Sequence, residues 1–295
     1  MPVTGINEVQ ANVQTMWSEL FMDELREDLL LGSLVNKDYD GDIKFKGDTV
    51  KVSQINAAAG SLKTVGVDAD TFDTELLSTT QIDIKADKRA VGAYEFDDLS
   101  MIQSQIGNKD SEIRASLLFA VQKKINSYLY SLVAPSVSAP AHKITGVTDF
   151  NAAQLSIVRN KASKAKWMKN KPWWLLSDPD FYGNMTDDAV LTSSDYGATD
   201  APMISGQMAL KRKGFNILED NSDAILTLGT DAAENKAIAF HPDFMHLVMQ
   251  TQPTFKISDQ HANKRFGFII SVDLVFGAKM GIDGDKKVIT ISEAV

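Results

Sequence analysis

Two segments in which apolar and polar residues alternate, separated by a long and weakly apolar stretch, determine the architecture of this chain. Residues 49–53 read Thr-Val-Lys-Val-Ser and residues 81–85 read Gln-Ile-Asp-Ile-Lys, a period-two pattern typical of half-buried strands. Compact domains seldom keep a connection of about 25 residues without a use for it. The pattern predicts a two-stranded arm that projects from the body. Because an isolated hairpin is marginal in water, such an arm needs a surface supplied by another subunit.

Two amphipathic helices are predicted on either side of this arm. Residues 8–31 carry apolar side chains at three- and four-residue spacing, Trp17 and Phe21 among them, and their polar face is acidic. Residues 109–133 give the strongest helix signal, with either Asn108 or Asp110 as the cap and Pro135 beyond the end. A helix as apolar as the first must dock on its own core or on a partner.

The rest of the chain alternates between short helical and strand patterns, which predicts an α+β fold. A tether of small residues with two prolines, at residues 134–142, precedes this region. Asp178-Pro179-Asp180 opens a helix that carries Phe181, Tyr182 and Met185. The other expected elements are a helix over about 150–167 and strands at 173–177, 215–218, 225–228, 237–240, 247–257, 267–280 and 288–291.

Composition excludes several classes of protein and site. The chain has no cysteine, which removes disulfides and thiolate sites and fits folding in a reducing cytoplasm. No apolar run is long enough to cross a membrane, and no secretory signal is visible at the N-terminus. The net charge of −9 argues against a protein whose main task is to grip phosphate backbones.

The charge is concentrated in two places. Residues 1–40 hold eight acidic side chains against two basic ones, whereas residues 155–171 hold six basic side chains and no acid, including Arg159, Lys161 and Lys164. One interpretation is charge complementarity between copies, in which the acidic arm meets the basic helix of a neighbour. The other is two solvated helix faces, which is the more common origin of a charge run.

Motifs for catalysis and cofactor binding are missing from the sequence. Asn36, Asp38 and Asp40 copy the start of a calcium-binding loop, but its twelfth position, which requires a bidentate Glu, is Gly47. We therefore interpret this segment as an acidic turn and rank it as a weak calcium candidate. His241 and His246 are spaced five apart, so we expect ordinary packed or surface side chains and no metal site. Phosphate loops and nucleophile elbows are absent, which predicts a chain that is not an enzyme and has no cofactor.

The order of elements resembles the major capsid protein of tailed bacteriophages, the Hong Kong 97-type fold. The similarity rests on Trp174 to Tyr182 as a strand-to-helix step, on Lys213 to Leu218 as a glycine followed by a strand, and on Phe268 to Lys279 as the long closing strand. The resemblance implies five regions. They are an N-terminal arm at 1–40, an E-loop hairpin with its base at 41–100, a P-domain spine helix at 101–139, an A domain at 140–245 and P-domain terminal strands at 246–295.

The resemblance also implies a function without catalysis. Copies would form hexamers and pentamers that close, in the host cytoplasm, into an icosahedral phage head around double-stranded DNA. The resemblance implies a separate scaffolding protein or a scaffolding segment already removed. A portal, decoration proteins and weakly, non-specifically contacted DNA would be the other partners, and no membrane would be involved. The expected interface residues are Trp17, Phe21, Lys63, Val65, Phe72, Arg159, Lys161 and Lys164. Two alternatives stay open: an encapsulin-type bacterial nanocompartment, and a metal- or nucleotide-dependent enzyme.

Overall fold

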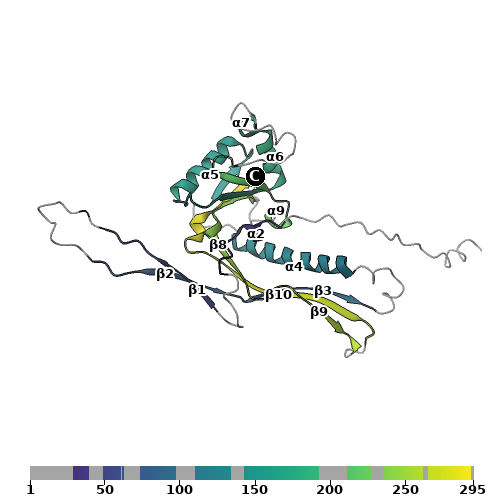
Figure 1. The fold of residues 1–295 in the computed structure, drawn as a ribbon. Helices are drawn as coiled ribbons and strands as arrows, with labels where there is room; N and C mark the ends of the chain where they lie inside the picture. Colours follow the sequence, from purple (N-terminus) through teal and green to yellow (C-terminus); the bar gives the residue numbers. More distant parts are fainter. Residues whose placement is uncertain are drawn as a thin grey trace, which may run out of the picture.

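The computed structural model describes residues 29–39, 49–60, 62, 74–97, 110–133, 143–192, 211–226, 235–261 and 265–293. Within these ranges the chain forms a body built on two sheets and one long helix, from which a two-stranded arm projects (Figure 1). No helix in the described ranges is long and apolar enough to cross a membrane. The predicted mixture of helices and strands is confirmed.

The arm is an antiparallel pair, β1 (Thr49–Ile55) and β2 (Thr79–Lys85), in the register Thr49 to Lys85 through Ile55 to Thr79. Both strands fall where the alternation of the sequence predicted them.

A four-stranded antiparallel sheet lies beneath the long helix. Its central strand is β10 (Phe268–Met280), which pairs on one side with β3 (Lys88–Phe96) and on the other with β8 (Met245–Met249) and β9 (Thr254–Asp259). The helix α4 (Asp110–Val133) lies over β3 and β10 and buries its apolar stripe there. The backbones approach closely, since a Cβ at Gly92 of β3 would be 3.3 Å from the carbonyl oxygen of Leu117. The short helix α2 (Leu31–Leu34) packs on α4.

A five-stranded mixed sheet in the order β4-β11-β7-β5-β6 forms the second unit. Its strands are β4 (Lys143–Val147), β5 (Trp173–Ser177), β6 (Phe215–Glu219), β7 (Asn235–Phe240) and β11 (Val288–Glu293). Successive side chains of a strand point to opposite faces, and the two cores divide accordingly. Leu175 and Ala239 belong to the core with α5 (Ala152–Lys164) and α6 (Pro179–Asp187), while Leu176 and Phe240 belong to the core that contains α4.

The remaining described elements are short. They are α7 (Ala189–Thr192), α9 (Asp223–Leu226) and the 3₁₀ turns η3 (Pro242–Phe244) and η5 (Gly284–Lys287).

Two helix starts follow the capping rules. The side chain of Asn151 accepts hydrogen bonds from the backbone N–H groups of Ala153 and Gln154 at the start of α5. That of Asp178 accepts one from Phe181 at 3.0 Å at the start of α6, whose first residue is Pro179. Both helices therefore begin within two residues of the positions the sequence predicted.

Three expectations differ from the structure. Residues 225–228 were expected to form a strand, but Asp223–Leu226 is the helix α9, begun by a hydrogen bond from Ser222 N–H to the buried Asp220 side chain. Residues 247–257 were expected to form one strand, but the chain breaks at Gln250–Pro253 into β8 and β9. Proline has no N–H for a ladder bond and so ends a central strand readily.

The third difference concerns the closing strand. We expected β11 to lie with the P-domain terminal strands, yet it pairs with β4 and β7 in the five-stranded sheet. The turn at η5 makes this possible, because it separates β11 from β10 and turns the chain into the other sheet. The helix predicted at 8–31 lies outside the described residues except at its last three positions.

Candidate functional site

The base of the arm is anchored to the body by a small apolar cluster. Val52 and Ile84 are buried there together with Val248 of β8. The ammonium group of Lys279 on β10 also donates to the backbone carbonyl of Asp83, at 3.1 Å. The arm therefore starts from a fixed position on the four-stranded sheet.

Beyond the strand ends, polar side chains keep the two sides of the arm together. The Asn56 side chain donates to Ser78 Oγ at 3.2 Å and accepts from Thr80 Oγ1 at 3.1 Å, and Ala59 N–H donates to the Glu75 carboxylate at 3.0 Å. These bonds bridge positions 16 to 24 residues apart in the sequence. The arm consequently keeps its paired form well past the last ladder hydrogen bond.

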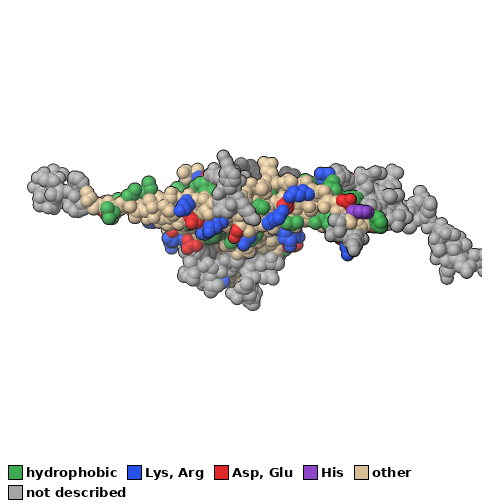
Figure 2. Space-filling model, turned by 90° about the horizontal axis from the view of Figure 1, so that it is seen from below, with side chains coloured by type: hydrophobic (Ala, Val, Ile, Leu, Met, Phe, Trp, Pro, Cys, Tyr) green, Lys and Arg blue, Asp and Glu red, His purple; other side chains and the backbone are tan. Residues whose placement is uncertain are grey.

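The outer part of the arm exposes large apolar side chains. The exposed fractions are 67% for Ile55, 102% for Leu62, 98% for Leu76 and 75% for Leu77. Figure 2 shows hydrophobic side chains along the projecting arm. Exposed apolar side chains gathered on one projection mark an interaction surface. The expected contact residues Lys63, Val65 and Phe72 belong to the same loop but lie outside the described residues, as do Trp17 and Phe21 of the N-terminal segment.

A basic face forms the second candidate contact surface. Arg159 and Lys164 are exposed on α5. Arg159 lines a cleft of about 250 Å³ together with Lys169 and Lys211, and Lys211 comes from the segment that leads into β6. Lys211 has no local signal in the sequence that links it to Arg159, because only the pairing of β5 with β6 brings the two residues to the same cleft.

Two other cations of the basic run are engaged within the subunit. Lys161 donates from Nζ to the carbonyl oxygen of Lys143 at 2.7 Å, and burial lowers its pKa. Lys171 forms an ion pair of 2.8 Å with Asp243. Both tie α5 or the loop after it to other elements. The charge of the basic face that is available to a partner therefore comes mainly from Arg159, Lys164, Lys169 and Lys211.

The weak calcium candidate forms a turn. The Asn36 side-chain oxygen accepts from Asp38 N–H at 2.7 Å, and its amide nitrogen donates to Asp38 at 3.0 Å and to Asp243 at 2.9 Å. Asn and Asp favour such side-chain bonds in turns. Asp40 lies outside the described residues. Within the described ranges no three His, Asp or Glu side chains gather as a metal site would require.

Asp243 is the centre of a polar junction between the two sheets and the segment around Asn36. Burial alone would raise the pKa of its carboxyl group, but hydrogen bonds from Lys171 and Asn36 outweigh burial and hold that pKa below the ordinary value. His241 and His246 lie beside it and are buried, with exposed fractions of 1% and 7%. Of the two positions that the sequence left open, packed or surface, the structure shows the packed one for both histidines. Burial lowers the pKa of each imidazole, while the neighbouring carboxylate of Asp243 acts in the opposite direction.

The lowered histidine pKa values predict a loss of stability in mild acid. The unfolded chain protonates its histidines near the ordinary value of 6.5, whereas the folded chain resists protonation of His241 and His246. The unfolded state therefore binds more protons, and we expect the urea midpoint to fall as the pH is lowered from about 7.5 to about 5.5. The double substitution His241→Gln with His246→Gln should flatten this dependence, whereas His261→Gln, at an exposed position, should leave it unchanged. An equal slope in all three proteins would contradict the prediction.

No protein-family model and no curated protein sequence matches the chain. Solved structures match over nearly its whole length. A structure from Mycobacterium phage Che8 has a TM-score of 0.73 at 19% identity, covering 95% of this chain and 96% of that one.

Two further structures carry capsid descriptions. The capsid of cyanophage P-SCSP1u matches with a TM-score of 0.73 at 13% identity, covering 99% of this chain and 95% of that chain. The capsid of Ralstonia phage GP4 matches with a TM-score of 0.69 at 12% identity, covering 100% and 98%. The chain therefore has the Hong Kong 97-type fold shared by these phage capsid structures.

Proposed function

We propose that this chain is a major capsid protein that assembles into the icosahedral head of a phage. The observation that carries the proposal is the match to capsid structures over the full length of both chains, which includes the arm as well as the body. A shell needs several large interfaces from one chain. The arm supports such a role because its exposed apolar side chains would be covered by a neighbouring copy. The protein would reside in the virion.

Within this proposal the elements take the roles of the named regions of the fold. The arm of β1 and β2 is the E-loop, α4 is the spine helix of the P domain, and the five-stranded sheet with α5 and α6 is the A domain around the local symmetry axes. Residues 1–40 are the N-terminal arm. Hexamers and pentamers are the assembly units, and adjacent copies are the main partners.

The other proposed partners follow from the same role. A scaffolding protein would guide assembly, a portal would occupy one vertex, and decoration proteins could bind the outer surface. The packaged double-stranded DNA would be contacted weakly and without sequence preference. The net charge of −9 supports this, because an acidic wall does not hold phosphate groups.

Electron microscopy tests the proposal directly. The full chain, expressed alone and with the scaffolding protein of its source, should yield closed shells of uniform diameter that sediment far ahead of the free subunit. Shells that carry a foreign enzyme bound through a peptide would favour a nanocompartment. A chain that stays a monomer under all assembly conditions would overturn the proposal.

Charge reversal on the basic face should weaken assembly. We expect the double substitution Arg159→Glu with Lys164→Glu to lower shell yield at least about tenfold, because an acidic segment of a neighbour would then be repelled. The control, Lys124→Glu, changes an exposed cation on α4 and should assemble normally. Shell yield is measured by sedimentation, and the deficit should shrink when salt screens the repulsion. Normal shell yield from the double variant would show that the basic face is a solvated surface and that assembly does not depend on its charge.

A further inference from the structure

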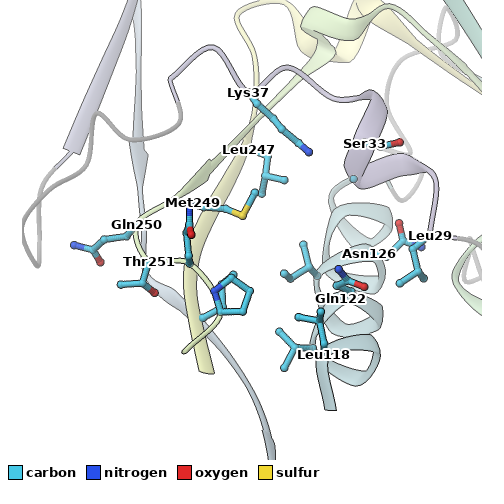
Figure 3. Close-up of a pocket in the computed structure, with 16 residues that line it drawn as sticks. Leu29, Ser33, Lys37, Leu118, Gln122, Asn126, Leu247, Met249, Gln250 and Thr251 are labelled. Atoms are coloured by element: carbon cyan, nitrogen blue, oxygen red, sulfur yellow. The ribbon is translucent and has the colours of Figure 1, made fainter. Parts of the chain in front are cut away.

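A groove on α4 is left uncovered among the described residues. It has a volume of about 730 Å³ and runs between α4 and the turn that joins β8 to β9 (Figure 3). Leu118, Val121 and Ile125 of α4 form one wall, and Leu247 and Met249 of β8 form the other. A volume of this size is within the range of pockets that bury most of a bound ligand.

The inner wall of this groove contains a polar group without a partner. Asn126 is only 2% exposed, and neither its side-chain nitrogen nor its side-chain oxygen has a hydrogen-bond partner among the described residues. Such a group costs about 1–3 kcal/mol when it is left unsatisfied. An occupant that carries polar as well as apolar side chains would lower this cost, so Asn126 points to an amphipathic occupant and not to a purely apolar ligand.

The residues of the third wall show which segment of the chain is positioned to enter the groove. Leu29, Gly32 and Ser33, from α2 and the residues just before it, line the groove. The helix α2 starts without a side-chain cap, and Leu30 before it already has helical angles, φ −81° and ψ −42°. Uncapped helix starts leave backbone N–H groups without partners. The backbone at Leu30 is thus set to continue as a helix toward the N-terminus.

The contacts of α2 fix the direction of such a continuation. A Cβ at Gly32 would lie 3.7 Å from the side chain of Leu129, and Leu29 lines the groove together with Asn126. From the first pair to the second, both residue numbers decrease by three, which indicates that the two helices run in the same direction. Two further steps of four residues on each helix bring Leu25 to Gln122 and Phe21 to Leu118. These positions belong to the apolar stripe that the sequence predicts for residues 8–31.

We propose that the groove is the docking site of this chain's own residues 17–28, which continue α2 as a helix against α4. Residues 19–28 carry five acidic side chains and one basic one, and the exposed Lys37 at the groove rim complements that charge. Docking withholds Trp17 and Phe21 from other copies in the unassembled subunit. Only this last consequence rests on the proposed shell function.

Engineered disulfides test the docking. Because the chain has no native cysteine, only the two introduced cysteines can form a disulfide. The test pair is Leu25→Cys with Gln122→Cys, studied in the unassembled fraction of the full chain. It should form a disulfide within one chain at least about tenfold faster than the control pair, Leu25→Cys with Lys124→Cys. The reason is that a disulfide needs Cα atoms within about 7 Å of each other. Lys124 is exposed and lies two residues from Gln122, on the other side of α4. Non-reducing electrophoresis separates bonds within a chain from bonds between chains.

A second pair keeps the test independent of any single variant. Phe21→Cys with Leu118→Cys should close in the same way, one helical turn further along α4. Bonds that form only between chains would show that a second copy occupies the groove, and would overturn the proposal. Failure of both pairs to outpace the control would also overturn it. Neither result bears on whether the chain forms shells.

Discussion

Removal of residues 58–78 should leave a folded subunit that cannot form shells. The deletion joins Ala57 to Thr79, which pairs with Ile55, so residues 56 and 57 become a two-residue hairpin turn. Adding Ala57→Gly provides the Asn-Gly sequence that such turns favour. The anchoring cluster of Val52, Ile84 and Val248 is untouched. We therefore expect the thermal midpoint to change little, while shell yield falls below detection, because the exposed apolar part of the arm is gone.

The control for this deletion is the full chain with Ala57→Gly alone, which should assemble normally. Circular dichroism and thermal unfolding report on folding, while sedimentation and electron microscopy report on shells. Shells from the deletion variant would show that the arm is dispensable for assembly, and an unfolded variant would show that the loop contributes to the core.

The substitution Gly277→Ala should cause a large loss of stability from a single methyl group. Gly277 lies on β10 where the chain leaving β2 crosses it, and a Cβ there would be 2.1 Å from the carbonyl oxygen of Lys85. Backbone atoms cannot swing aside as the end of a side chain can, so the base of the arm must shift. We expect a loss of about 3 kcal/mol, measured as a lower urea midpoint, with a parallel loss of shell yield.

Gly183→Ala is the matched control. Gly183 lies inside α6, and a Cβ there meets nothing within 4 Å. Because glycine is a poor helix former, the added methyl group should be neutral or raise stability by up to about 1 kcal/mol. Equal effects of the two substitutions would mean that the crossing at Gly277 relaxes easily.

Elements whose residues carry their own local signals could be predicted from the sequence. The helix α4 has one apolar stripe from Ile113 to Leu132, and Asn151 and Asp178 are capping residues. The strand β10 is a long apolar run, and β1 and β2 alternate. In each case a period of 3.6 or 2 determines the element before any tertiary contact forms.

Elements that depend on distant partners could not be predicted in the same way. The short run Ile225 to Leu228 is compatible with a strand, but α9 packs against α4 and β7, and the buried Asp220 just before it accepts a hydrogen bond from Tyr130 of α4. The strand β3 was not anticipated, because its alternation is broken by Gly92 and charged residues, and its place is set by pairing along β10. Propensity is a weak prior that tertiary context overrides.

The candidate contact surfaces show the same division between features predicted from local sequence and features that depend on tertiary contacts. The sequence by itself determined that an arm and a basic run exist, since both are contiguous segments. Only the tertiary structure decided that Lys161 and Lys171 are engaged inside the subunit, that Lys211 joins Arg159, and that Asn126 faces a groove without a partner. The physical reason is that periodicity and charge are local properties of the chain, whereas burial and hydrogen-bond satisfaction depend on which distant strands and helices come together.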